Sequence, residues 1–240
     1  MKRERSPSPN DNQEARKRIN IGEKKSVGTQ TDKTSEVYHV LYETKRRQAT
    51  DYKVRCERTP INKDNRLKRI ADSLEAFLCY AEAFYNQNEA HKAGYQYAAF
   101  LNPEVYFESV YESLKAQPPK LIGMFKYVHA TTNKIYYDRK RERCIQLLGE
   151  HHVTFFKKLE DDPFGGTEIQ VEYDRSVSSV TKDIKFCNKK IYETILLFEA
   201  AKEYTGDEDL DIDDSLKARV YAQDQLNSWR VKKNVKPVAF

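Results

Sequence analysis

Apolar side chains recur at intervals of three and four residues along most of the chain after position 35. The pattern is clearest in residues 66–85, whose apolar positions include Leu67, Ile70, Ala71, Leu74, Phe77, Leu78, Ala81, Phe84 and Tyr85. This spacing is typical of a helix with one apolar face. The sequence therefore predicts a helix here, with solvated positions that include Arg66, Lys68, Arg69 and Asp72.

The same period predicts further helices, in residues 35–57, 89–101, 103–116, 120–132, 138–160, 176–204 and 215–233. Asn102-Pro103 and Pro118-Pro119 are typical helix boundaries. Residues 161–174 and 205–214 are interpreted as loops. Gly and Pro number only 8 each, which disfavours an all-β fold rich in tight turns. The predicted fold class is all-α, with about eight helices that pack as antiparallel neighbours.

Residues 66–101 resemble one tetratricopeptide unit, because two predicted helices rich in small and aromatic residues end at Asn102-Pro103. Tetratricopeptide arrays repeat at about 34 residues, and the chain has no second clear copy. The prediction is a tetratricopeptide-like helical stack formed by residues 36–240 as one domain, with the only Trp, Trp229, on its last helix.

Residues 1–35 contain few large apolar side chains and many charges, so they bury too little surface to offset ordering entropy. They are predicted to form a disordered basic tail. Two basic clusters in it, separated by 12 residues, have the form of a bipartite nuclear import signal: Lys2, Arg3, Arg16, Lys17 and Arg18. Such clusters on an extended chain can occupy two acidic grooves of one receptor. This pattern predicts a nuclear protein, and the alternative is a generic basic tail.

Two other short motifs lie in the tail. Ser6 and Ser8 each precede a proline, as in sites of proline-directed kinases, and phosphate there would reduce the positive charge. The second motif resembles peptides that bind the small dimeric dynein light chain by adding a strand to a sheet edge. It comprises Lys25, Ser26, Val27, Gly28, Thr29, Gln30, Thr31 and Asp32.

The sequence contains no assembled catalytic or metal-binding motif. The five histidines, His39, His91, His129, His151 and His152, lack an HExxH arrangement. Acidic residues 207–214 lack the Gly and Glu of a calcium loop. The four cysteines form no CxxC pair and are interpreted as reduced core residues of an intracellular protein. No apolar run approaches the ~18 residues that span a bilayer. We therefore expect no enzymatic activity, cofactor or metal, and no membrane partner.

The net charge is +5, which permits nucleic-acid or acidic partners. Basic residues crowd two parts of the predicted helical domain. If they converge, they would form a surface that follows a phosphate backbone. The alternative is a set of solvated helix faces. The candidates are Lys45, Arg46, Arg47, Arg66, Lys68, Arg69, Arg139, Lys140, Arg141 and Arg143.

Several segments carry a resemblance to a known family. YETKRRQATDY (residues 42–52) precedes RIADSLEAFLCYAEAFYNQNEA (residues 69–90), and DRKRERCIQLLGEHHVTFFKKLE (residues 138–160) precedes KKIYETILLFEAAKEY (residues 189–204) and the Trp229 helix. In this order they resemble the C-terminal homology domain of the AF-four/FMR-two family, also called ALF or Lilliputian proteins. The resemblance covers residues 38–233 and is a helix pattern without a catalytic motif.

The resemblance implies a function in transcription. Members of that family are nuclear scaffolds of the super elongation complex, which gather the elongation kinase, its cyclin and elongation factors at RNA polymerase II. Their C-terminal domain is an all-helical, tetratricopeptide-like module that dimerises and has been linked to nucleic-acid binding. The resemblance thus implies a non-enzymatic nuclear scaffold that forms a homodimer or a heterodimer with a related scaffold.

Two departures from the family pattern affect this expectation. The family's long kinase-binding region has no counterpart in residues 1–35, and its Ser/Pro-rich insertion is replaced at most by residues 161–174. The resemblance therefore implies dimerisation more strongly than it implies recruitment of the elongation kinase. Two other functions remain open: a helical adaptor bound to dynein light chain, and a helical module that binds RNA or DNA.

Overall fold

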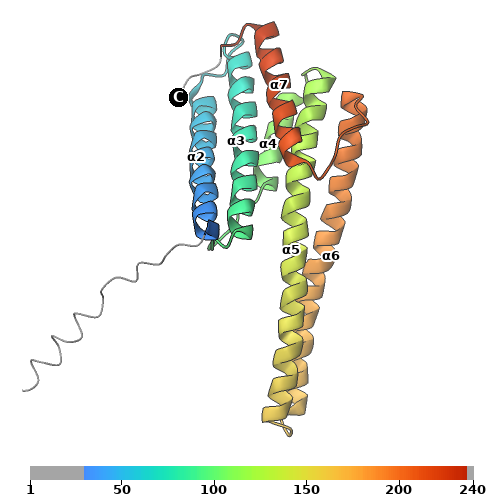
Figure 1. The fold of residues 1–240 in the computed structure, drawn as a ribbon. Helices are drawn as coiled ribbons and strands as arrows, with labels where there is room; N and C mark the ends of the chain where they lie inside the picture. Colours follow the sequence, from blue (N-terminus) through green and yellow to red (C-terminus); the bar gives the residue numbers. More distant parts are fainter. Residues whose placement is uncertain (1–29, 237–240) are drawn as a thin grey trace, which may run out of the picture.

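The computed structural model describes residues 30–236, which form only helices and the connections between them. Within these residues there are six helices (Figure 1): α2 (Gln30–Arg58), α3 (Arg66–Lys92), α4 (Glu104–Leu114), α5 (Pro119–Asp161), α6 (Gly166–Thr205) and α7 (Ser215–Lys233). The predicted all-α class is confirmed. None of the described helices combines the length and the apolar content that crossing a bilayer requires.

Helix α3 lies at the centre of the fold, in contact with α2, α4, α5 and α7. Helices α5 and α6 run side by side as a hairpin of 43 and 40 residues. Figure 1 shows this hairpin continuing well past the ends of α2, α3 and α7. We call residues 145–179 the arm, because the last buried residue of α5 is Cys144 and the first buried residue of α6 is Val180.

The main core forms where α3, α4, α5 and α7 meet. Its largest fully buried side chains include Leu74, Phe77, Phe107, Phe125 and Leu226. Burial of each such side chain stabilises the fold by roughly 1.5–3 kcal/mol. Helix α2 contributes to a separate, smaller cluster of Ala49, Tyr52, Ala76 and Cys79. Helix α2 packs closely along α3, and polar contacts add to this attachment.

Local signals explain several helix ends. Pro119 occupies the first turn of α5, where its missing N–H is not needed. Gly206 ends α6 with a left-handed φ of 67°. The carboxylate of Asp214 accepts a hydrogen bond from the Lys217 N–H at 2.8 Å and caps α7. As a result, α7 has the predicted bounds, 215–233.

The number of helices differs from the expected eight for two physical reasons. The predicted helices at 120–132 and 138–160 are one continuous helix, because the intervening residues 133–137 contain no Pro or Gly and Tyr137 is buried. The predicted helix at 89–101 does not form: α3 continues to Lys92 and Gly94, at φ 99°, opens an irregular connection to residue 103. The tetratricopeptide-like pair expected in residues 66–101 is therefore absent.

Two predicted boundaries also move. Residues 161–174 were expected to form a loop, but α6 begins at Gly166 and the turn of the hairpin is confined to residues 162–165. Helix α2 begins at Gln30, inside the tail expected to extend to residue 35. The residues that follow the Gly165-Gly166 pair continue the helical period of α6. The non-helical connection between α5 and α6 is therefore shorter than the polar composition of residues 161–174 indicates.

Candidate interaction surfaces

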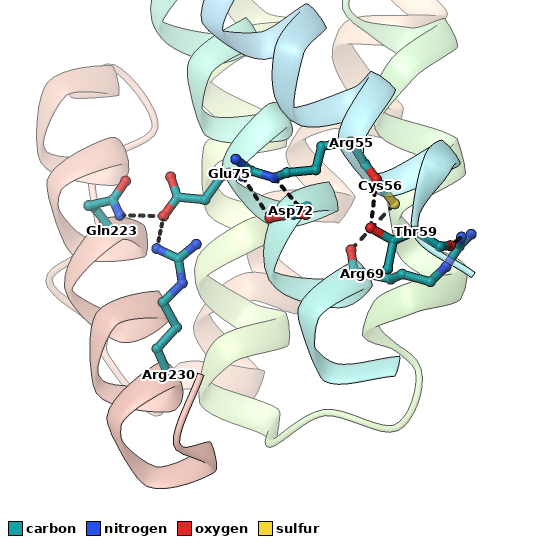
Figure 2. A network of polar contacts seen from close by, with 8 residues as sticks. All are labelled: Arg55, Cys56, Thr59, Arg69, Asp72, Glu75, Gln223 and Arg230. Carbon is teal, nitrogen blue, oxygen red and sulfur yellow. Dashed lines mark hydrogen bonds and ion pairs between the residues drawn. The ribbon is translucent and has the colours of Figure 1, made fainter. Parts of the chain in front are cut away.

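A polar network fastens α2 and α7 to the first turns of α3 (Figure 2). The Arg55 side chain of α2 donates through Nε and Nη2 to the two carboxylate oxygens of Asp72, at 2.9 and 2.8 Å. This two-pronged geometry is the strongest form of the arginine–carboxylate pair. The hydrogen bond to Asp72 raises the pKa of Arg55 above its usual value. The contact fixes the register of α2 against α3.

On the other side of α3, Glu75 receives two donors from α7. Arg230 forms an ion pair with Glu75, and Gln223 Nε2 donates to Glu75 Oε1 at 3.2 Å. Both charged side chains are less than a tenth exposed. The Arg230 Nε atom is buried without a hydrogen-bond partner in the described chain. A buried pair of this kind is very sensitive to the removal of one partner.

A third set of contacts closes the connection between α2 and α3. Cys56 Sγ donates to the Arg69 carbonyl at 3.4 Å, and Arg69 Nη1 donates to the Thr59 carbonyl at 2.5 Å. The Thr59 hydroxyl in turn donates to the Arg55 carbonyl at 2.8 Å. Figure 2 shows these residues together with the Asp72 and Glu75 pairs. The whole network orients three helices.

The sequence pattern did not predict this network. It placed Asp72 on the solvated face of its helix, whereas Asp72 is 1% exposed. The prediction was wrong because Arg55 and α7 cover that face. One signal was present: Asp72 and Glu75 flank Leu74 in an otherwise apolar run, where an acidic side chain needs a cationic partner.

A second polar cluster lies inside the core around His129. Its Nδ1 lies 2.8 Å from the Tyr111 hydroxyl and its Nε2 lies 3.0 Å from Asn133 Nδ2. Burial lowers the pKa of His129 to about 3, so the ring is neutral at pH 7. Burial also raises the pKa of Tyr111 above its usual value. Both groups are held as neutral hydrogen-bonding partners, which suits a structural role.

All four cysteines are free thiols. Cys79, Cys144 and Cys187 are buried and Cys56 is half-buried. Burial raises the pKa of Cys79 to about 12 and also raises those of the other three. At neutral pH these thiols are protonated, and a protonated thiol is a poor nucleophile. Among the described residues, no group of three or more His, Cys, Asp or Glu side chains could hold a metal ion.

The predicted nucleic-acid residues fall into three separate groups. On α2, Lys45 pairs with Glu82 at 3.0 Å and Arg46 pairs with Glu43 at 2.9 Å, while Arg47 is exposed. The second group, Arg66, Lys68 and Arg69, lies in the first turn of α3. About 11 residues of α2 separate Arg47 from the end of that helix, which is roughly 16 Å. The first two groups therefore do not form one continuous patch.

The third group lies midway along α5 and is engaged within the chain. Arg139 lies over the Phe100 ring, 3.4 Å from its centroid, and donates to Asn88 at 3.2 Å. The others contact Phe186, Asp138 and Glu150 through Lys140, Arg141 and Arg143 respectively. These contacts favour the interpretation of the group as folded helix faces with local partners.

The remaining predicted motifs lie mostly outside the described residues. These are the import residues Lys2, Arg3, Arg16, Lys17 and Arg18, the phosphorylation candidates Ser6 and Ser8, and residues 25–29 of the light-chain motif. The last three residues of that motif, Gln30 to Asp32, belong to the first turn of α2. Binding of this motif as an added strand would require that turn to unwind.

Exposed apolar side chains are concentrated on the α5–α6 hairpin. In the arm they are Ile145, Val153, Phe156, Phe164 and Val171, all more than half exposed. Nearer the body, α6 exposes Phe186, Tyr192, Ile195 and Leu196. Within the arm, the two helices meet along a narrow seam in which Phe155 packs on Tyr173 with ring centroids 4.3 Å apart. Outside this seam, the exposed apolar side chains of the arm face solvent in the described part of the chain.

Comparisons of the chain with protein-family models, with curated proteins and with solved structures give no match. The geometry described above and the segment resemblance are therefore the basis for a functional proposal.

Proposed function

We propose that this protein is a non-enzymatic nuclear scaffold that dimerises through its α5–α6 arm and acts in transcription elongation by RNA polymerase II. The observation that carries the dimerisation is the set of apolar side chains exposed on the arm, which includes Phe164 at 100%, Val153 at 71% and Phe156 at 61% exposure. Two hairpins can bury such faces against each other as a four-helix bundle.

The transcription part of the proposal rests on the family resemblance of residues 38–233. The all-helical fold supports it at the level of fold class. The partners that follow from the resemblance are a second copy or a related scaffold, and, less directly, the elongation kinase with its cyclin and elongation factors. Nuclear residence follows from the basic clusters of the tail.

The first experiment measures the mass of the full chain by light scattering during size-exclusion chromatography. One copy is 28.2 kDa, so a dimer would have twice that mass. We expect Val153→Glu together with Phe156→Glu to yield monomers, because both side chains are exposed and the charges would face the partner copy. Val231→Glu is the matched control, since Val231 is 82% exposed on α7. A monomeric wild type at micromolar concentration would contradict the proposal.

The second experiment identifies partners by affinity purification of the tagged full chain from nuclear extract, followed by mass spectrometry. Elongation kinase, cyclin or elongation factors in the eluate would support the transcription role. Dynein light chain alone would instead favour the adaptor hypothesis, which titration calorimetry with a peptide of residues 24–32 would then test. RNA that binds with a steep salt dependence would favour the nucleic-acid module.

A further inference from the structure

An open cavity of about 660 Å³ lies where the connection between α2 and α3 approaches the connection between α4 and α5. Its walls come from the end of α2, the first turn of α3 and the residues that follow α4. The polar network described above supports one wall, because Arg69 and Cys56 belong both to the network and to the cavity lining (Figure 2). The wall is thus held in place by the fold.

Among the described side chains, the charged ones that line this cavity are all cations: Lys63, Arg66, Arg69 and Lys115. The side chains of Lys63 and Arg66 are exposed and make no ion pair or hydrogen bond with any described residue. Arg69 donates through Nη1 to the Thr59 carbonyl, and its other N–H groups can donate to a ligand. A cavity lined by several cations attracts an anionic ligand.

The uncharged part of the lining is aliphatic. Ile61, Ile70 and Ala116 contribute apolar surface beside the cations. Ile61 is 88% exposed, an unusual position for a large apolar side chain next to basic residues. The described residues of the lining include no aromatic ring, although proteins that bind single-stranded nucleic acid stack the bases on aromatic rings. The combination therefore favours an acidic peptide with an aliphatic side chain over a nucleic acid.

We propose that this cavity binds an acidic segment of a partner protein, with carboxylates on Lys63, Arg66 and Arg69 and one aliphatic side chain against Ile61 and Ile70. The carboxylates supply charge-assisted hydrogen bonds. The aliphatic side chain supplies apolar burial and sets the position of the segment. This site is separate from the arm and does not depend on the proposed dimerisation.

The chain itself supplies a suitable probe. Residues 207–214 have the sequence DEDLDIDD, in which two aliphatic residues alternate with carboxylates. In the folded chain, Leu210 is buried and Ile212 packs against the core, so the chain's own copy is engaged elsewhere. A fluorescently labelled synthetic peptide of this sequence can be titrated with the full chain and followed by anisotropy. The amide counterpart NQNLNINN has the same apolar residues without the charges.

We expect the acidic peptide to bind and the amide peptide to bind at least about tenfold more weakly, because hydrogen bonds between charged groups are roughly twice as strong as those between neutral groups. The double variant Lys63→Glu with Arg66→Glu should also lower the affinity for the acidic peptide at least about tenfold. Ile61→Ser should lower the affinity for the acidic peptide by about threefold or more, although the charge of the cavity does not change. All three residues are more than a third exposed, so the helical circular dichroism signal should stay that of the wild type.

The matched control is Lys157→Glu with Lys182→Glu, which introduces the same change of charge on the hairpin at two exposed positions. If this control lowers the affinity for the acidic peptide as much as the cavity variant does, binding is a general charge effect and the proposal fails. The proposal also fails if the cavity variant binds normally, or if the amide peptide binds as tightly as the acidic one. A single-stranded oligouridine that binds more tightly and displaces the peptide would assign the cavity to nucleic acid instead.

Discussion

Arg230 and Glu75 form a buried ion pair although 155 positions separate them in the sequence. The pair joins the last helix to the central helix, in the same turns where Arg55 joins α2 to Asp72. Three helices are thus joined through two acidic residues of α3, Asp72 and Glu75, that lie about one turn apart. This arrangement adds to the packing of α2 along α3 and orients both outer helices on the central one.

Replacing Glu75 with Gln should destabilise the protein by about 3–5 kcal/mol, because the Arg230 charge would stay buried without its partner. Arg230→Met should cost a similar amount. The double variant Glu75→Met with Arg230→Met should lose less stability than the two single variants lose together, since neither buried charge remains. Urea unfolding at pH 7 measures all three. As a control, Lys189→Met at the exposed pair with Glu193 should change stability by less than about 0.5 kcal/mol.

Stability should fall as the pH is lowered below 6.5 because of His129. Its pKa is about 3 in the folded chain, against 6.5 for an unperturbed histidine, so the unfolded state binds the proton first. Stability is therefore fully present above pH 6.5 and decreases as the pH falls toward 3. This one group should account for a loss of about 3 kcal/mol between pH 6.5 and pH 4.

The variant His129→Gln isolates that effect, since its side chain does not titrate. Its stability at pH 7 will be lower, but the loss between pH 6.5 and pH 4 should be smaller than in the wild type by about 3 kcal/mol. His152→Gln, at an exposed position of the arm, should retain the full pH dependence. Equal losses for the wild type and His129→Gln would show that His129 is accessible to protons in the folded chain.

Substitution by alanine should change stability in opposite directions at two glycines of α5. A Cβ at Gly123 would lie 2.6 Å from Thr205 Cγ2 and 2.9 Å from Tyr204 Cβ, so Gly123→Ala should destabilise by about 1–3 kcal/mol. A Cβ at Gly149 would meet nothing within 4 Å. Gly149→Ala should therefore stabilise by about 0.5–1 kcal/mol through helix propensity. Thermal unfolding of both variants measures the difference, and destabilisation by both would contradict this account of Gly123.

Much of the fold was predictable because its signals are local. The bounds of α7 follow from Asp214 and from the period that ends at Lys233, and Pro119 marks the start of α5. The register of distant helices was not predictable, because nothing near Asp72 in the sequence shows that Arg55 covers it or that α7 lies nearby. The same limit applies to the sites. Residues 45–47 and 66–69 are close in sequence, and only the antiparallel packing of α2 on α3 shows that they form separate groups.

Arg139 should anchor the irregular connection between α3 and α4. It lies 3.4 Å from the centroid of the Phe100 ring, and burial lowers its pKa to about 10. Arg139→Ala removes this contact and the hydrogen bond to Asn88, so residues 93–103 should detach more often. Chymotrypsin, which cuts after aromatic residues, should then cleave at Phe100 and the nearby tyrosines about tenfold faster, as expected for a lost contact of about 1.4 kcal/mol. Arg143→Ala, whose partner Glu150 is exposed, should leave the cleavage rate unchanged. If both variants are cleaved at the wild-type rate, the connection is held by its other aromatic contacts, such as those of Phe100 with His91 and Tyr97, and not by Arg139.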